Sequence, residues 1–147
     1  MEVRLMAFES KRRILNNSNS AKSGVKDSEK RRTICLVVED DEEVRKRLSA
    51  FLERSGYKSF EVGLGAEAIE SYKKFKPDIV FLDVKLPDID GLIVLKKIRA
   101  FDSAAKVCLF TGVNEESVIS EAKKYGACGY LVKPVQIRDI LKILKEL

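Results

Sequence analysis

Five side chains that could do chemistry follow or end short apolar runs of the sequence. They are Glu39 and Asp40 after "TICLVV", Asp83 at the end of "DIVFLD", Thr111 after "KVCLF" and Lys133 after "CGYLV". Carboxylates brought close together repel one another unless a cation lies between them, and Mg²⁺ prefers such oxygen ligands. A carboxylate beside Mg²⁺ and an ammonium group can attack phosphorus, because phosphoryl transfer depends mainly on positioning and on charge neutralisation. These residue types therefore indicate aspartyl-phosphate chemistry if the fold gathers them.

Other kinds of chemistry lack the residues that they need. The 147 residues include no histidine, which removes the usual general base, the Ser-His-Asp and Cys-His arrangements and most zinc sites. Cys35, Cys108 and Cys128 have no metal-ligand spacing, and each lies among apolar residues. We expect them to be small buried hydrophobes in a reducing compartment.

The elements that must position these residues alternate between two periodicities from residue 33 onward. Apolar runs predict strands over 33–38, 57–62, 78–83, 106–110 and 128–132, and helical spacing predicts helices over 42–56, 66–75, 91–101, 114–126 and 135–147. Apolar runs that do not alternate suit a parallel sheet covered on both faces, with the helices as crossovers. We therefore predict an α/β fold, a doubly wound (βα)5 flavodoxin-like domain with a parallel five-stranded sheet in the order 2-1-3-4-5.

In such a fold the carboxyl ends of the strands meet at one edge, and the ligand crevice lies at the switch between strands 1 and 3. Asp41 is a further acid at this edge.

Simpler interpretations of these residues stay open. Residues 39–43 also suit the acidic first turn of a helix, and Thr111 with Gly112 suits a turn. Tyr130 could be an ordinary strand aromatic, and Lys133 an exposed lysine.

The net charge of +5 lies entirely in residues 1–32, which hold nine Lys/Arg and four Asp/Glu. We expect this basic, polar N-terminal segment to be a flexible tail, although a short helix over 2–15 stays open. We expect no nucleic-acid partner except through this tail. Residues 33–147 are expected to form one domain.

The sequence has no apolar run long enough for a membrane span and no secretory signal, so a cytoplasmic location is predicted.

Four ordered motifs resemble the receiver domain of two-component response regulators, of the single-domain chemotaxis type. They are "VVEDDEEVR" (37–45), "DIVFLDVKLPDIDG" (78–91), "LFTG" (109–112) and "GYLVKP" (129–134). The resemblance implies that Asp83 is the phosphoacceptor and that Thr111 and Lys133 contact the phosphoryl group. It also implies that Mg²⁺ is held by Glu39, Asp40, Asp83 and the backbone carbonyl of Lys85. Thr111 and Tyr130 would be the switch residues, and the Lys133–Pro134 peptide would be cis.

The function implied is that of a signalling phosphoprotein in a two-component system or phosphorelay. Asp83 would receive a phosphoryl group from a histidine kinase or a histidine phosphotransfer protein. The domain would catalyse its own phosphorylation and dephosphorylation rather than the turnover of an external substrate. Phosphorylation would switch the face made by the helix over 114–126, the strand over 128–132 and the last helix, which would bind a downstream protein or form a homodimer. On the last helix we expect an inward stripe and a second apolar face: Ile137, Ile140, Leu141 and Leu144 inward, Ile143 and Leu147 on the second face.

Two departures and two alternatives accompany the resemblance. Glu39 stands where many receivers have aspartate. Lys85 and Val113 stand where residues that position a hydrolytic water occur in fast-dephosphorylating receivers, so slow dephosphorylation is predicted. One alternative is a metal-dependent phosphohydrolase with Asp83 as nucleophile, although such enzymes usually have a second Asp at the position of Lys85. The other is a receiver fragment of a longer regulator with an output domain outside this sequence.

Overall fold

The structure is a computed structural model that describes residues 5–7, 31–112 and 115–147, with side chains described from residue 31 onward. The strands are β1 (Leu5–Ala7), β2 (Ile34–Val38), β3 (Lys58–Val62), β4 (Ile79–Asp83), β5 (Val107–Thr111) and β6 (Gly129–Val132). The helices are α2 (Glu42–Arg54), α3 (Gly65–Phe75), α4 (Gly91–Phe101), α5 (Glu116–Lys124) and α6 (Ile137–Lys145). The five predicted strands and five predicted helices are therefore all present, with ends that differ by at most two residues.

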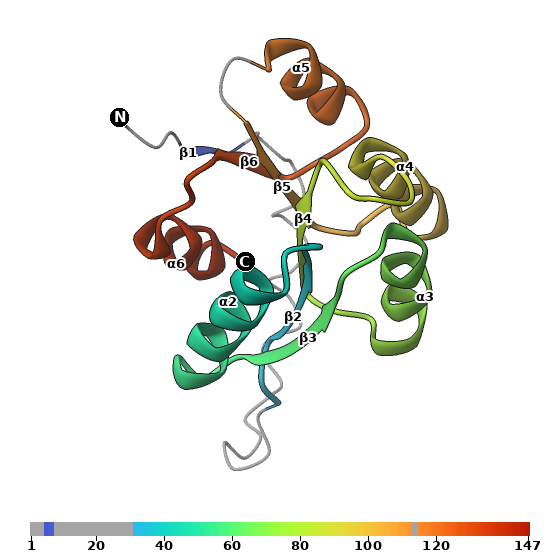
Figure 1. Cartoon of the computed structure of the whole chain (residues 1–147). Coiled ribbons are helices and arrows are strands. Elements are labelled where there is room, and N and C mark those ends of the chain that lie inside the picture. The colour runs from blue at the N-terminus through green and yellow to red at the C-terminus, as the bar shows by residue number, and fades with distance from the viewer. Residues whose placement is uncertain (1–4, 8–30, 113–114) are drawn as a thin grey trace, which may run out of the picture.

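Strands β2 to β6 form a parallel sheet in the order β3-β2-β4-β5-β6, which is the predicted order 2-1-3-4-5 (Figure 1). The register brings the carboxyl ends of the central strands together. Val38 pairs with Leu82, and Asp83 pairs with Phe110. The loops that leave β2, β4, β5 and β6 therefore meet at one edge of the sheet, where the predicted site residues lie.

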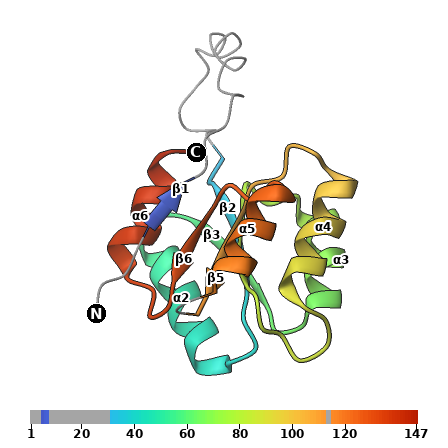
Figure 2. The same ribbon diagram turned by 90° about the horizontal axis from the view of Figure 1, so that it is seen from above.

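The two faces of the sheet are covered by different helices. Figures 1 and 2 show α2 and α6 on one face and α3, α4 and α5 on the other. Side chains alternate along each strand, so Val37 and Phe81 pack under α2 and α6 while Leu36 and Val80 pack under α3 and α4. The interiors of β2, β4 and β5 are buried on both faces, which explains why their sequences are continuously apolar, whereas the edge strand β3 is only partly buried.

The three cysteines behave as predicted small hydrophobes. Cys35 and Cys108 are buried, and Cys128 is partly buried against the same core cluster. Burial raises the pKa of the Cys35 thiol to about 12 and the pKa of the Cys108 thiol well above its usual value. Both thiols therefore stay protonated and unreactive at neutral pH.

A sixth strand, β1, pairs antiparallel with β6 at the edge of the sheet, Met6 lying opposite Tyr130 in the register. The sequence analysis did not predict this strand. It left open a short helix over 2–15, but residues 5–7 form a strand instead. Arg31 and Arg32, assigned above to the tail, instead form ion pairs with the folded domain, to Asp78 at 2.7 Å and to Glu53 at 2.9 Å. The rest of the predicted tail lies outside the described residues.

Helix α6 corrects one packing prediction. Ile143, expected on a second, outward face, is buried with Ile140 and Leu144. Ile137, expected to point inward, is 42% exposed, and Leu147 is 44% exposed. The exposed apolar side chains thus lie at the first residue of α6 and just beyond its end rather than along a second stripe. Among the described residues no helix is long and apolar enough to cross a bilayer.

Candidate functional site

The carboxylates of Glu39, Asp40 and Asp83 form a cluster at the carboxyl edge of the sheet. One oxygen from each lies within 4.8 Å of the others. Glu39 and Asp83 are only 4% and 3% exposed, whereas Asp40 is exposed. Glu39 directly follows β2 and Asp83 ends β4, so the pairing of these two neighbouring strands brings the acids together. Carboxylate oxygens at this spacing are a suitable donor set for a hard divalent cation.

Lys133 supplies the cation that the described structure places in this cluster. Its Nζ lies 2.9 Å from Asp83 Oδ2 and 3.8 Å from Glu39 Oε1. The backbone N–H of Lys133 donates to the carbonyl of Thr111 at 2.8 Å, which fixes the lysine beside the end of β5. The Lys133–Pro134 peptide is cis, as the resemblance implied. One ammonium cannot neutralise three carboxylates, so the cluster keeps a negative excess when all of its acids are ionised.

Burial and the neighbouring charges of the cluster shift the pKa values of Glu39 and Lys133. Burial, together with repulsion from Asp83, raises the pKa of Glu39 to about 7, even though the backbone N–H of Asp41 donates to Glu39 Oε2 at 3.0 Å. Burial alone would lower the pKa of Lys133, but the hydrogen bond and attraction from Asp83 outweigh burial and raise it. Lys133 is therefore charged at neutral pH, while Glu39 is partly protonated.

The loop after β4 holds Asp83 by its backbone. The N–H of Lys85 donates to Asp83 Oδ1 at 3.3 Å, so each oxygen of the Asp83 carboxylate has a donor. The N–H of Gly91 donates to the carbonyl of Val84 at 2.7 Å, which closes the loop against the strand. A Cβ on Gly91 would lie 2.5 Å from the Asp83 carbonyl oxygen. Only glycine fits this close approach of two backbone segments.

The same loop also organises α3. Asp88 accepts hydrogen bonds from the N–H groups of Gly65 at 2.8 Å and Ala66 at 2.9 Å, so it caps α3 from a loop that is distant in sequence. These bonds lower the pKa of Asp88, because they favour its ionised form. The turn residues of "LPDIDG" therefore tie the segment that follows Asp83 to the neighbouring helix.

Thr111 ends β5, next to the strand that carries Asp83, and is 2% exposed. Its hydroxyl donates to Glu115 Oε1 at 3.4 Å. Tyr130 lies in β6, is buried, and packs in the core cluster beneath α3, α4 and α5. Because side chains alternate along strands, Thr111 and Tyr130 lie on the same face of the sheet as Leu109.

The structure thus gathers most, but not all, of the residues expected at the site. Asp41 does not join the cluster, since its side chain accepts from the N–H of Val44 at 3.1 Å and caps α2. Glu115, which the sequence analysis missed, contacts Thr111. It lies within the helix predicted over 114–126, and helical spacing alone does not indicate that its side chain contacts Thr111. Val113, predicted to bear on dephosphorylation, lies outside the described residues.

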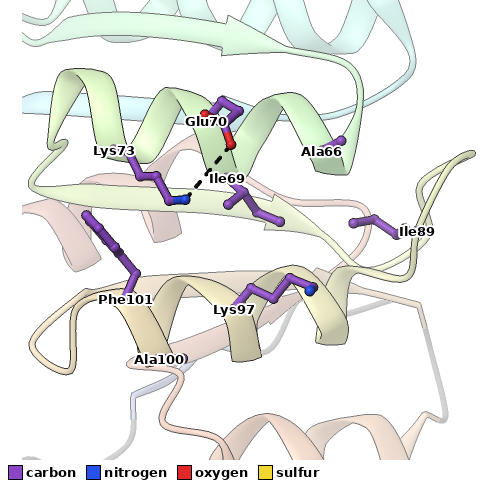
Figure 3. Close-up of a pocket in the computed structure, with 8 residues that line it drawn as sticks. All are labelled: Ala66, Ile69, Glu70, Lys73, Ile89, Lys97, Ala100 and Phe101. Carbon is purple, nitrogen blue, oxygen red and sulfur yellow. Dashed lines mark ion pairs between the residues drawn. The ribbon is translucent and has the colours of Figure 1, made fainter.

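A groove between α3 and α4 is separate from the acidic cluster. Figure 3 shows that Ile69, Lys73 and Phe101 line it, with Ile89 at one end. Lys73 forms an ion pair with Glu70 at 3.9 Å and lies over the ring of Phe101. No lining residue belongs to the acidic cluster, so this groove is not part of the candidate site.

The fold and the acidic cluster define a doubly wound α/β domain with a candidate cation site at its strand ends. A protein-family model described as "Response regulator receiver domain" matches residues 35–145 of the chain. The chain therefore belongs to the response regulator receiver domain family, which serves two-component signalling.

Known proteins of similar sequence and a solved structure of similar fold agree with this family assignment. The chain is 32% identical to sporulation initiation phosphotransferase F of Bacillus subtilis, over 76% of this chain and 90% of that protein. It is 33% identical to the chemotaxis protein CheY of Thermotoga maritima, over 76% of this chain and 93% of that protein. A CheY-like receiver domain from Methanospirillum hungatei superposes with a TM-score of 0.76 at 27% identity, over 79% of this chain and 93% of that one.

Proposed function

We propose that Asp83 accepts a phosphoryl group and that the domain transmits this event as a signal. The observation that carries the proposal is the geometry around Asp83. Its Oδ2 contacts the Lys133 ammonium at 2.9 Å, its Oδ1 accepts from the Lys85 N–H at 3.3 Å, and the Glu39 and Asp40 carboxylates are adjacent. Lys133 can hold a phosphoryl oxygen, and the Thr111 hydroxyl, on the neighbouring strand, can donate one more hydrogen bond.

The donor set fits Mg²⁺. Glu39, Asp40 and Asp83 offer carboxylate oxygens within 4.8 Å of one another, and the Lys85 carbonyl is the further ligand that family resemblance suggests. When bound, the ion would neutralise charge on the carboxylates and on phosphoryl oxygens. The chain's own residues would orient the Asp83 carboxylate and hold Lys133 and Thr111 at the phosphoryl group.

The proposed donor is a phosphohistidine on a histidine kinase or a histidine phosphotransfer protein. The sequence of 147 residues contains no histidine, so this group comes from outside it. A small acyl phosphate is a second source. A cytoplasmic site of action remains a prediction from the sequence.

The proposed output is a change in the surface made by α5, β6 and α6. Phosphorylation adds about two negative charges at Asp83, which attract the Thr111 hydroxyl. Tyr130 lies two residues before Val132, the pairing partner of Thr111, so movement of Thr111 changes the space beside its ring. A downstream protein or a second copy of the domain would bind the altered surface. The exposed Ile137 on α6 offers apolar contact area.

Incubation with acetyl phosphate tests the proposal. With Mg²⁺, intact-mass spectrometry is expected to detect one phosphoryl adduct, and EDTA is expected to prevent it. Asp83→Asn should abolish the adduct. Asp41→Asn is the matched control, because it also removes one acid near β2 while asparagine still caps α2. Equal labelling of the Asp83→Asn and Asp41→Asn proteins would refute the proposed acceptor.

A further inference from the structure

Glu115 contacts two residues that flank the acidic cluster. Its Oε1 accepts from the Thr111 hydroxyl at 3.4 Å, and its Oε2 lies 3.6 Å from the Lys85 ammonium. Glu115 thus joins the end of β5 to the loop after β4, with its side chain only 22% exposed. The two contacts use both oxygens of the carboxylate.

The Glu115 side chain is free to make these contacts because α5 does not use it. Glu115 is the N-cap residue of α5, yet its side chain makes no capping hydrogen bond. Its backbone carbonyl accepts from the N–H groups of Val118 and Ile119, both at 3.1 Å. Ser, Thr, Asp and Asn are the residues that usually cap helices through their side chains. The side chain of Glu115 contacts Thr111 and Lys85 instead.

A hydroxyl has a single proton to donate, so Thr111 can satisfy only one acceptor at a time. In the described structure that acceptor is Glu115 Oε1. A phosphoryl oxygen on Asp83 would compete for the same proton. We infer that Glu115 is a positioning residue that holds Thr111 in the unphosphorylated arrangement and opposes its movement to the phosphoryl group, an inference that rests on the proposed function.

Lys85 offsets only a small part of the Glu115 charge. Its ammonium partly offsets the Glu115 charge, but the Lys85 side chain is 78% exposed, and exposed ion pairs contribute little. Glu115 therefore acts mainly through the hydrogen bond from Thr111 and through its negative charge, which disfavours a further anion nearby. Removal of the carboxylate should favour the phosphoryl-bound arrangement.

Beryllofluoride with Mg²⁺, a stable mimic of a phosphoryl group, tests this inference, with its affinity measured by NMR titration of the backbone amide signal of residue 111. Glu115→Ala should bind the mimic about three- to tenfold more tightly than the wild type. Glu115→Gln keeps an oxygen acceptor without the charge and should show a smaller gain. Glu116→Ala is the matched control, because it removes the same charge from the exposed first turn of α5. It should bind like the wild type.

A Thr111→Ala background separates positioning from a general charge effect. In the Thr111→Ala background, Glu115→Ala should change the affinity for the mimic less than it does in the protein that keeps Thr111, because the competing hydroxyl is gone. Equal affinities of Glu115→Ala and Glu116→Ala would overturn the role of Glu115 while leaving the proposed function intact. Failure of the wild type to bind the mimic would overturn the proposed function, and with it this inference.

Discussion

Lys133 reaches Asp83 from the far side of β5, its Nζ lying 2.9 Å from Asp83 Oδ2. The two residues are fifty positions apart in sequence, and the parallel order β4-β5-β6 brings them together. The ammonium therefore contacts the carboxylate that we propose as both a metal ligand and the phosphoacceptor. This arrangement predicts opposite effects of Lys133 on metal binding and on phosphoryl transfer.

Replacing Lys133 with methionine should tighten Mg²⁺ binding and slow phosphorylation. Loss of a positive charge beside Asp83 and Glu39 favours a divalent cation, by about three- to tenfold given that the Lys133 side chain is 42% exposed. Phosphorylation by acetyl phosphate should slow by about 100-fold, because one group that holds the phosphoryl oxygens is lost. Calorimetric Mg²⁺ titration and labelling rates measure the two effects. Lys142→Met, an equal charge change on the exposed side of α6, should alter neither.

Glu39 should make the metal-free protein sensitive to pH. Its pKa is about 7 in the folded protein and 4.5 ordinarily, so the folded state binds more protons between these values. The free energy of unfolding in EDTA should therefore fall as the pH rises through this window. Mg²⁺ should restore stability at about pH 8 more than at about pH 5, because it binds the ionised carboxylate.

Thermal unfolding of the wild type and of Glu39→Gln measures this dependence. The glutamine cannot ionise, so the variant should lose less stability between about pH 5 and about pH 8. Identical pH profiles for the two proteins would show that Glu39 is already ionised throughout the range.

Gly91→Ala should destabilise the domain and disturb the loop that follows Asp83. The new Cβ would lie 2.5 Å from the Asp83 carbonyl oxygen and 2.7 Å from Val84 Cα, and backbone atoms cannot yield as a flexible side chain can. A cost of about 1–3 kcal/mol is expected from urea unfolding. Gly63→Ala is the control, since its nearest contact is the Arg45 guanidinium. An equal cost at both positions would contradict the predicted backbone clash.

Asp88→Ala should lower the melting temperature, because the N–H groups of Gly65 and Ala66 lose their acceptor. The pKa of Asp88 is lowered in the folded protein, so its contribution is present above its unfolded pKa and is lost as the pH falls through the folded value. The difference between wild type and variant should therefore shrink in acid. A difference that persists at strongly acidic pH would mean that ionisation of Asp88 does not matter.

The fold could be predicted because strand interiors and helix faces repeat along the sequence. Leu36, Val80 and Leu109 lie in runs buried on both faces, and the order of strands and helices then left few topologies. The acidic cluster followed from topology, since parallel strands end at one edge. Asp41 shows the limit of this reasoning. It is adjacent to Asp40, yet the start of α2 uses its side chain.

Features that depend on long-range contacts could not be predicted. Strand β1 is three residues long, too short to carry a periodic signal, and it pairs with Gly129, Tyr130 and Leu131, which are distant in sequence. The burial of Ile143 is an exception, because Ile140, Ile143 and Leu144 share one face of α6 at helical spacing, a pattern that the sequence carries and that our prediction misjudged. The contact of Glu115 with Thr111 joins the residue before α5 to the end of β5, and helical spacing alone does not reveal it.

Chemical trapping of the acyl phosphate tests the central claim most directly. After labelling with acetyl phosphate and Mg²⁺, borohydride reduces a phosphorylated aspartate to homoserine, and peptide mass spectrometry identifies its position. Homoserine is expected at position 83 and at no other aspartate. Homoserine at Asp40, or no reduction product in protein that carries the phosphoryl adduct, would contradict Asp83 as the acceptor.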